Sequence, residues 1–460
     1  MSTIRNGGML MKEVQAFLTG RIWLKEQTPF PLPVIEEYIR NGFISPHTGI
    51  QSNQNSSSKK TKSSNCRRCG NKQLTAFQCA KCNGTCLYCR QCIQMGRISS
   101  CSELITWSGP SEVYEVNHCF TWSGTLTSLQ AKASNELLIS VQRNQSHLIY
   151  AVCGAGKTEL LYPSIFDALQ RGLRVCVATP RTDVVLELAP RFQQVFPQTI
   201  IHALYGGSPD NSDFAQLILA TTHQLLRFEE AFDVVFVDEA DAFPYTVDKS
   251  LQFAVQKAKK KSAAVHTITA TPSDELLSQA DNISLISQRF HGFPLPIPRF
   301  VGLWNYKKHM YKDQLPQKLV KWTKQCLQND QPFLIFFPTI DLMECALPLF
   351  QQIHVDISAV HAEDPERKEK VLKLRRKKVC GLLTTTILER GITIPNVQVA
   401  VVGADEKIFT SSALIQISGR VGRSVDFPSG DLVFFHHGIS LEMDKAKATI
   451  IEHNTNREVL

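Results

Sequence analysis

Short apolar runs recur along most of the chain, and each run ends in small or polar residues. The first series predicts strands over residues 147–150, 175–178, 217–220, 234–237 and 267–271. Unbroken apolar runs of this length are typical of parallel strands that are buried on both faces of a sheet. Because the longer segments between the runs suit helices, the pattern predicts an α/β fold built on a doubly wound parallel sheet.

A second series of apolar runs predicts another sheet of the same kind. Its strands are expected over residues 333–337, 380–386 and 397–402. Alternating prolines within residues 290–300 predict a stiff connector between the two series. We therefore expect a first lobe over residues 106–290, a linker over 291–300 and a second lobe over 301–460.

The part of the chain before these lobes divides by composition. Residues 1–50 show a helical pattern at 34–39 but no residues whose chemistry suggests a role. Residues 51–65 are rich in Ser, Asn, Gln and Lys, with little to bury, and this predicts a flexible linker. Residues 66–105 hold most of the cysteines and predict a small metal-binding module.

A glycine-rich segment, Ala151 to Thr158, follows the first strand of the first lobe and precedes a helical pattern. Glycines at such a turn let backbone N–H groups approach phosphate oxygens, a lysine reaches the β- and γ-phosphates, and a hydroxyl takes Mg²⁺. This loop predicts an ATP site. Its nucleotide-binding residues are expected to be Ala151, Gly154, Ala155, Gly156, Lys157 and Thr158.

Two adjacent carboxylates, Asp238 and Glu239, follow the apolar run at 234–237. Beside a phosphate loop, Asp238 is expected to hold Mg²⁺ and Glu239 to activate the attacking water. A solvated acidic turn is the alternative interpretation, and the presence of Lys157 in the same lobe argues against it.

Two arginines, Arg420 and Arg423, stand three residues apart in a glycine-containing segment near the end of the second lobe. At this spacing they share one face of a helix or turn. A guanidinium keeps its charge and binds phosphate through two N–H groups, so both arginines are expected to reach the γ-phosphate.

Polar residues at strand ends of the first lobe suit a nucleic-acid backbone, because ligands of doubly wound sheets bind at the carboxyl ends of the strands. These candidates are Thr179, Arg181, Thr221 and Thr222.

Gln130 lies about twenty residues before the phosphate loop, and its amide has the donors and acceptor needed to recognise adenine.

Eight of the 14 cysteines lie between Cys66 and Cys101, mostly as Cys-x-x-Cys pairs. Each such pair presents two thiolates to one tetrahedral ion, which predicts zinc. We expect the pair Cys66 and Cys69 to join a later pair, and Cys89 and Cys92 enclose a loop of suitable length. Cys79 and Cys82, with Cys86 or Cys101, are alternatives or a second site, so the number of ions stays open. The metal can also serve only to stabilise a module that lacks its own core.

Composition sets the broad class. A hydrophobic content of 43% with 20% charged residues is ordinary for a globular protein, and no run approaches the roughly 18 apolar residues of a membrane helix. The N-terminal residues lack a signal-peptide pattern, so a cytoplasmic location is expected. The net charge of +8 is compatible with a polyanionic partner but is common among soluble proteins.

Residues 120–440 resemble the superfamily-2 helicases, which contain two RecA-like lobes. The resemblance is carried by the segments 151–158, 179–181, 221–223, 238–241, 269–271, 385–394 and 416–423. It implies a DNA contact for Thr385, within the segment that includes Glu389 and Arg390. Two alternative functions are a replication-restart or repair helicase that unwinds duplex DNA and a zinc adaptor that does not hydrolyse ATP.

The cysteine module narrows the resemblance. Cys66-x-x-Cys69-Gly and the segment from Tyr88 to Arg97 look like the late-competence ComFA family of Gram-positive bacteria. This family is similar to a zinc-bearing form of the replication-restart primosomal helicase. The resemblance implies an ATPase stimulated by single-stranded DNA that helps import transforming DNA. It also implies work at the inner face of the cell membrane, with proteins of the uptake channel and a partner encoded in the same operon.

Overall fold

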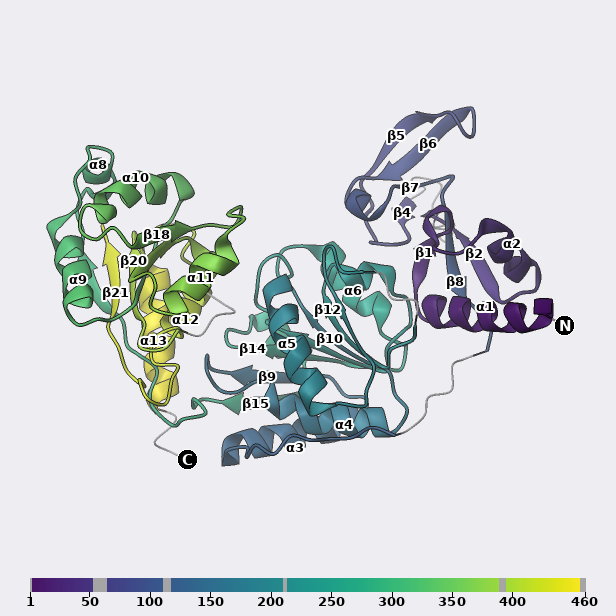
Figure 1. Ribbon diagram of the computed structural model, residues 1–460, viewed down its shortest axis with the longest axis horizontal. Helices are drawn as coiled ribbons and strands as arrows, with labels where there is room; N and C mark the ends of the chain where they lie inside the picture. Colours follow the sequence, from purple (N-terminus) through teal and green to yellow (C-terminus); the bar gives the residue numbers. More distant parts are fainter. Residues whose placement is uncertain (1, 53–63, 111–116, 210–212, 389–393, 456–460) are drawn as a thin grey trace. The chain divides into compact units, whose positions relative to one another are not determined.

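The computed structural model describes residues 2–52, 64–110, 117–209, 213–388 and 394–455 (Figure 1). The chain forms two compact units. The first consists of Met1–Thr125, Ser134–Ile149 and Leu161–Ser284. The second consists of Leu126–Ala133, Tyr150–Leu160 and Leu285–Leu460, and it therefore includes the whole phosphate loop.

The first unit begins with a small N-terminal domain. Helices α1 (Ser2–Leu18) and α2 (Leu32–Arg40) accompany an antiparallel sheet in the order β1-β8-β2, formed by Ile22–Leu24, Glu103–Trp107 and Ile44–Thr48. A 3₁₀ turn, η1 (Lys25–Gln27), separates β1 from α2. The central strand β8 comes after all the clustered cysteines. The cysteine module is therefore inserted within this domain.

The inserted module is made of short antiparallel strands. β3 (Ile50–Ser52) pairs with β4 (Ser64–Cys66), and a second sheet has the order β5-β6-β7, formed by Leu74–Cys79, Gly84–Cys89 and Ile98–Ser99. A 3₁₀ turn, η2 (Ile93–Met95), precedes β7. Most of the segment predicted as a linker, residues 53–63, lies outside the described residues.

In the described parts of the first lobe, one sheet has the strand order β11-β12-β10-β13-β14-β9-β15. Its strands are β9 (His147–Ala151), β10 (Val175–Thr179), β11 (Ile201–Leu204), β12 (Leu217–Thr221), β13 (Val234–Asp238), β14 (Val265–Thr269) and β15 (Asn282–Ile286). Pairing is parallel from β11 through β14. All five predicted strands are present. The two strands that the sequence did not predict, β11 and β15, lie at the sheet edges and are only partly buried, so they lack continuous apolar runs.

The helices that accompany this sheet are α3 (Ser128–Gln142), α4 (Tyr162–Gln170), α5 (Thr182–Val195), α6 (Lys249–Ala258) and α7 (Asp274–Gln279), with 3₁₀ turns η3 (Glu159–Leu161) and η4 (Gln224–Arg227). Side chains cap the N-termini of α6 and α7. The Asp248 carboxylate accepts from the Ser250 N–H at 2.8 Å and caps α6. The Ser273 hydroxyl caps α7 in the same way.

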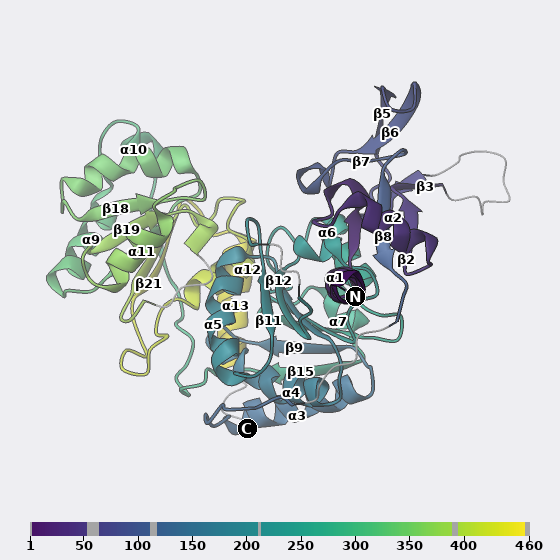
Figure 2. The ribbon, with the colours of Figure 1, turned by 45° about the vertical axis from the view of Figure 1, so that its right-hand side comes forward.

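The second unit contains a parallel sheet of order β16-β21-β20-β17-β19-β18 (Figure 2). Its strands are β16 (Arg299–Gly302), β17 (Phe333–Phe336), β18 (Ile357–Val360), β19 (Gly381–Thr384), β20 (Gln398–Val402) and β21 (Leu432–His436). The accompanying helices are α8 (Tyr306–Met310), α9 (Gln317–Gln328), α10 (Ile340–Gln351), α11 (Arg367–Arg375), α12 (Ser411–Ser418) and α13 (Leu441–Thr455), with a 3₁₀ turn η5 (Thr386–Leu388). Two α/β parallel sheets and an N-terminal cysteine module confirm the predicted fold class.

Candidate nucleotide site and cysteine clusters

The phosphate loop joins β9 to the 3₁₀ turn η3. Gly154 and Gly156 have φ of +83° and +71°, a region that side chains rarely adopt. A Cβ on Gly156 would lie only 2.3 Å from Nε2 of Gln130. A side chain at this position would therefore need both a left-handed backbone and a shift of the Gln130 amide, as expected for a loop that brings its backbone close to a ligand.

Gln130 supports this loop from the start of α3. Its Oε1 accepts from the Thr127 N–H at 2.8 Å, while the Thr127 hydroxyl accepts from the Gln130 N–H at 3.3 Å. This reciprocal pair is a capping box. The buried Nε2 donates to the carbonyl of Ala155 at 2.7 Å, so the glutamine fixes the loop backbone. The predicted contact between Gln130 and adenine stays a prediction.

Within the second unit, Arg289 links the loop to the segment that carries the two predicted arginines. Its guanidinium donates to the carbonyls of Val421 and Gly422 at 2.8 and 2.7 Å, and its side chain lies beside Gly154. The Phe290 N–H donates to the Gly154 carbonyl at 3.0 Å. Arg289 is almost fully buried, and burial lowers its pKa to about 10. The role of Arg289 could not be predicted from the sequence, because its partners are backbone carbonyls more than a hundred residues away.

The predicted arginines follow α12. Arg420 is buried, and Nε of Arg423 donates to the Gly419 carbonyl at 2.9 Å. The Cys153 thiol of the phosphate loop donates to Oε1 of Gln416 at 3.0 Å. A Cβ on Gly419 would lie 2.3 Å from that of Cys153, so only glycine allows this approach. The second unit thus brings Arg420 and Arg423 to the same region as the loop.

The acidic segment belongs to the first unit and extends the end of β13. Oδ1 of Asp238 accepts from the Glu239 N–H at 2.8 Å, and Glu239 adopts a φ of +54°. The Thr271 hydroxyl donates to the Asp241 carboxylate, which joins the ends of β13 and β14. These contacts hold Asp238 and Glu239 in one backbone arrangement, and their catalytic roles stay predictions.

Three of the predicted DNA-binding threonines are buried at the carboxyl ends of β10 and β12. Thr179 and Thr221 are paired in register, and the Thr222 N–H donates to the Thr179 carbonyl at 2.9 Å. Arg181 forms a two-bond ion pair with Asp183, at 3.1 and 2.7 Å. These residues lie together, and the hydroxyl oxygens of Thr179 and Thr222 are buried.

The fourth threonine, Thr385, is half-buried directly after β19. Residues 389–393 of the same predicted segment, including Glu389 and Arg390, lie outside the described residues.

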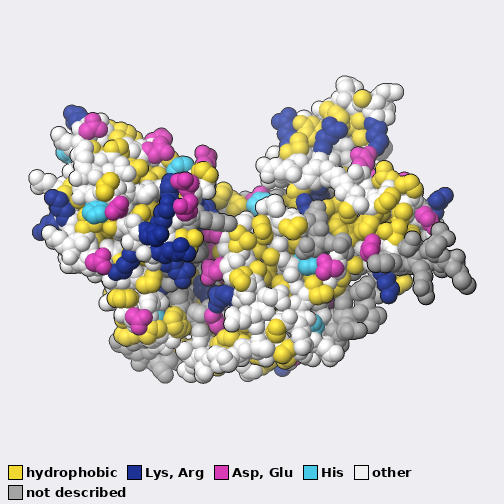
Figure 3. Space-filling model, viewed as in Figure 1, with side chains coloured by type: hydrophobic (Ala, Val, Ile, Leu, Met, Phe, Trp, Pro, Cys, Tyr) yellow, Lys and Arg dark blue, Asp and Glu magenta, His cyan; other side chains and the backbone are white. Residues whose placement is uncertain are grey.

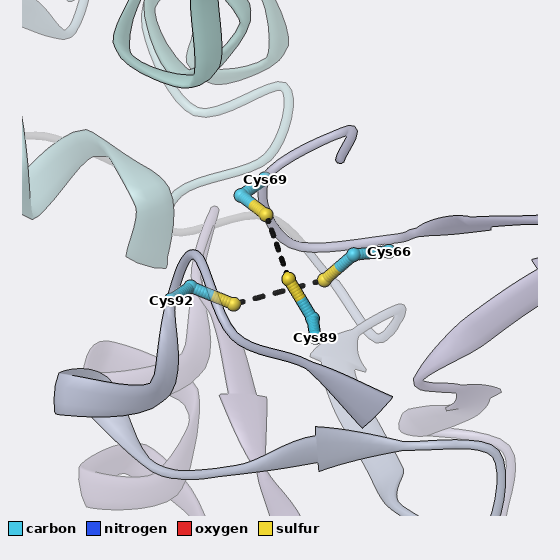
Figure 4. A group of neighbouring side chains, drawn as sticks. All are labelled: Cys66, Cys69, Cys89 and Cys92. Carbon is cyan, nitrogen blue, oxygen red and sulfur yellow. Dashed lines mark hydrogen bonds between the residues drawn. The ribbon is translucent and has the colours of Figure 1, made fainter. Parts of the chain in front are cut away.

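Among the described residues, one group of four buried cysteines consists of the pairs predicted from sequence. The sulfurs of Cys66, Cys69, Cys89 and Cys92 all lie within 4.8 Å of one another and converge on one point (Figure 4). Sγ of Cys66 is 3.7 Å from that of Cys92, and Sγ of Cys69 is 3.5 Å from that of Cys89. Sulfurs around a tetrahedral zinc ion are about 3.8 Å apart, whereas a disulfide requires about 2.05 Å. The donor set and spacing fit zinc.

This cluster, Cys66/Cys69/Cys89/Cys92, is part of the core of the first unit. Its cysteines pack in one apolar cluster with residues of β10, β12, β13 and α6. The Lys257 ammonium on α6 donates to the carbonyls of Arg68 and Leu226 at 2.7 and 2.9 Å, and loss of water lowers its pKa to about 8. Arg67 and Glu229 form an ion pair at 2.8 Å. The cluster is therefore built into the lobe that carries Asp238.

A second group joins the remaining four clustered cysteines. The sulfurs of Cys79, Cys82, Cys86 and Cys101 also lie within 4.8 Å of one another. Cys86 and Cys101 are alternatives from the sequence alone, and the structure brings both to the group.

Comparison with known proteins shows to which family the chain belongs. Competence protein ComFA of Bacillus subtilis (strain 168) is 43% identical over 456 residues, covering 98% of this chain and 97% of that protein. Competence protein ComFA of Streptococcus pneumoniae (strain ATCC BAA-255 / R6) is 39% identical, covering 80% of this chain and 88% of that protein. The chain belongs to the ComFA family. A model described as the competence protein ComFA N-terminal domain matches residues 7–106.

Two further family models match the lobes of this ComFA-family chain. The type III restriction enzyme res subunit model matches residues 123–274, and the helicase conserved C-terminal domain matches residues 314–425. Yeast (S. cerevisiae) Dbp5 bound to RNA and ADP BeF3 has a TM-score of 0.51 at 16% identity, covering 71% of this chain and 91% of that one. RecG bound to a three-way DNA junction has a TM-score of 0.52 at 16% identity, covering 74% and 47%. These two structures support the fold alone.

The ComFA family and its helicase domains establish the general class: a competence protein with the domains of an ATP-dependent nucleic-acid enzyme. In the described residues, no helix is both long and apolar enough to cross a membrane.

Proposed function

We propose that this ComFA-family protein is an ATPase stimulated by single-stranded DNA, which moves along the strand and drives import of transforming DNA. The observation that carries the proposal is the phosphate loop. The loop has two positive-φ glycines, and Gln130 holds its backbone. It also contacts the Gln416–Arg423 segment through Cys153. This arrangement suits a bound nucleotide whose hydrolysis depends on residues of the second lobe. We also propose that the first lobe spans residues 106–290, the linker 291–300 and the second lobe 301–460.

In this proposal, the backbone N–H groups of the loop and the Lys157 ammonium bind the phosphates of ATP. Thr158 and Asp238 would hold Mg²⁺, and a bound ion would supply charge neutralisation and polarisation of the γ-phosphoryl group. The Glu239 carboxylate orients the attacking water and accepts its proton. Arg420 and Arg423 offset the charge that develops on the transferred phosphoryl group.

The DNA partner is supported by a basic surface on the second unit. Four consecutive exposed residues, Arg375, Arg376, Lys377 and Lys378, lie at the last residue of α11 and directly after it, and Lys and Arg side chains gather over this element (Figure 3). Such a surface favours a polyanion and gives binding that weakens with salt. Closure of the lobes around ATP would shift the backbone-binding loops along the strand, so that hydrolysis produces movement.

The Cys66/Cys69/Cys89/Cys92 cluster would hold zinc and stabilise the module against the first lobe. We further propose that the protein acts at the inner face of the cell membrane. Its partners there would be proteins of the uptake channel and a protein encoded in the same operon, as the family resemblance implies.

The first test is phosphate release with single-stranded DNA, duplex DNA, RNA or no nucleic acid, at stated salt. Lys157→Ala and Glu239→Gln proteins should lose at least about 100-fold in the DNA-stimulated rate, because the first lacks the ammonium that binds the phosphates and the second lacks the base that activates water. Lys261→Ala, an exposed lysine of the first unit, is the matched control and should retain the wild-type rate. Unchanged turnover in either site variant would contradict the assignment.

A strand-displacement assay on the same protein separates the alternatives. Robust unwinding of duplex DNA would favour a replication-restart or repair helicase. Absence of hydrolysis by the wild-type protein under every condition would favour a zinc adaptor.

A further inference from the structure

We propose that Cys79, Cys82, Cys86 and Cys101 form a second zinc site that binds its ion independently of the first cluster. All four sulfurs lie within 4.8 Å of one another, and Sγ of Cys79 is 3.5 Å from that of Cys101. That separation matches ligands of one tetrahedral ion and is too long for a disulfide. Four thiols exclude the harder cations, because Mg²⁺ and Ca²⁺ prefer oxygen ligands.

The secondary structure explains how residues far apart in sequence reach this point. Cys79 ends β5, Cys82 lies in the turn of the hairpin, and Cys86 lies in β6. Cys101 comes from the turn between β7 and β8, next to the hairpin because β6 pairs with β7. The Ser100 N–H donates to the Leu87 carbonyl at 2.9 Å and holds this turn against β6. The β5–β6 hairpin and the turn after β7 therefore direct thiols to a single position.

The two quartets alternate along the chain. Ligands of the first site come from positions 66, 69, 89 and 92, and those of the second from 79, 82, 86 and 101. No cysteine is shared, so each quartet can supply all four ligands of one tetrahedrally coordinated ion. On binding, each thiol that becomes a thiolate ligand releases its proton to solvent, and no electron transfer is required.

The surroundings of the two quartets differ. All four cysteines of the first are buried in the core of the first unit, whereas Cys82 is exposed and Cys101 half-exposed. Cys79 and Cys101 line a surface hollow together with Gln78, Lys81 and Arg97. Because a chelator reaches an exposed site directly, the second ion should exchange faster than the first.

The second ion has a definite structural task. It would tie the tip of the β5–β6 hairpin to the turn that leads into β8, the central strand of the N-terminal sheet. The only further link at the tip that the described contacts include is the exposed ion pair of Lys81 and Glu26, at 2.6 Å. Exposed pairs contribute little to stability, so the ion would be the principal attachment of the hairpin tip.

Zinc content and zinc release in the full-length protein test this proposal. Metal analysis should find two zinc ions per wild-type chain, and release to a colorimetric chelator should be biphasic. Cys82→Ser and Cys101→Ser should each contain one ion and lose only the fast phase. Cys119→Ser, outside both quartets, is the control and should retain two ions and both phases.

Several results would overturn the proposal. One is a wild-type protein that contains a single zinc ion. Another is a Cys82/Cys101 double variant that retains two ions. A third is a Cys79–Cys101 disulfide found by mass spectrometry in protein purified under reducing conditions. Wild-type stoichiometry is itself decisive, so the test does not depend on the folding of any variant.

Discussion

At the scale of single residues, the phosphate loop depends on space as much as on charge. Gly156 and Gly172 have nearly equal φ, +71° and +72°. A Cβ on Gly156 would meet the Gln130 amide at 2.3 Å, whereas a Cβ on Gly172 meets nothing within 4 Å. The two glycines therefore separate the cost of backbone conformation from the cost of crowding.

Gly156→Ala should displace Gln130 from the Ala155 carbonyl and weaken nucleotide binding by about tenfold or more. Gly172→Ala should cost only the roughly 1–2 kcal/mol of a left-handed alanine and leave nucleotide affinity unchanged. Nucleotide titration and thermal unfolding of both proteins measure these effects. Equal nucleotide affinity in the two variants would show that the contact with Gln130 does not shape the loop.

A buried histidine predicts that the stability of the first lobe depends on pH. His266 lies in β14 against the Phe236 ring, at a centroid distance of 5.3 Å, and burial lowers its pKa to about 3. The folded state keeps this imidazole neutral, while the unfolded chain binds a proton below pH of about 6.5. The free energy of unfolding should therefore fall as pH drops from about 6.5 toward 3.

From pH 7 to pH 5 this histidine should lower the free energy of unfolding by about 2 kcal/mol. His266→Gln should flatten the pH dependence of the denaturation midpoint over this range. His309→Gln, at an exposed position of α8, should leave the pH dependence as it is in the wild type. The same slope in the His266 variant and the wild type would assign the acid sensitivity to other groups.

At the scale of elements, α6 connects the first cysteine cluster to the acidic segment. Its N-cap Asp248 accepts a hydrogen bond from Gln91, which lies between Cys89 and Cys92, at 3.2 Å. Further along the helix, Lys257 donates to the carbonyl of Arg68, between Cys66 and Cys69. Both Cys-x-x-Cys turns are thus attached to the helix that follows Asp238 and Glu239.

Lys257→Ala should leave the Arg68 and Leu226 carbonyls without this donor and lower stability by about 2 kcal/mol. It should also speed release of the first, slower zinc ion, because the turn at Cys66 and Cys69 would lose its attachment to α6. Lys249→Ala, an exposed lysine at the start of the same helix, is the control. Zinc release at the wild-type rate from the Lys257 variant would show that attachment to α6 does not affect how the first cluster holds its ion.

At the scale of the whole molecule, the features that could be predicted from the sequence are those that a local pattern of residues encodes. Strands such as β10 and β13 are continuous apolar runs because both of their faces are buried, and this pattern is visible in the sequence. The pairing of β1 with β8 joins Trp23 to Ile105, and no local pattern encodes such a partner. Arg289 was missed for the same reason, and Cys101 could be assigned to a quartet only once β7 was placed beside β6.

The N-terminal domain has a further consequence through its topology. The Gly49 N–H donates to the Ser102 carbonyl at 2.9 Å, so the cysteine module leaves and re-enters the domain at adjacent positions. Replacement of residues 50–101 by a short turn would leave the path of β2 and β8 unchanged. The module can therefore be removed or exchanged as one unit, and we call it the cassette. The same replacement would remove four sulfurs from the core of the adjoining lobe. Exchange of this cassette between relatives should therefore succeed only when the surface that receives it, α6 and η4, is exchanged with it.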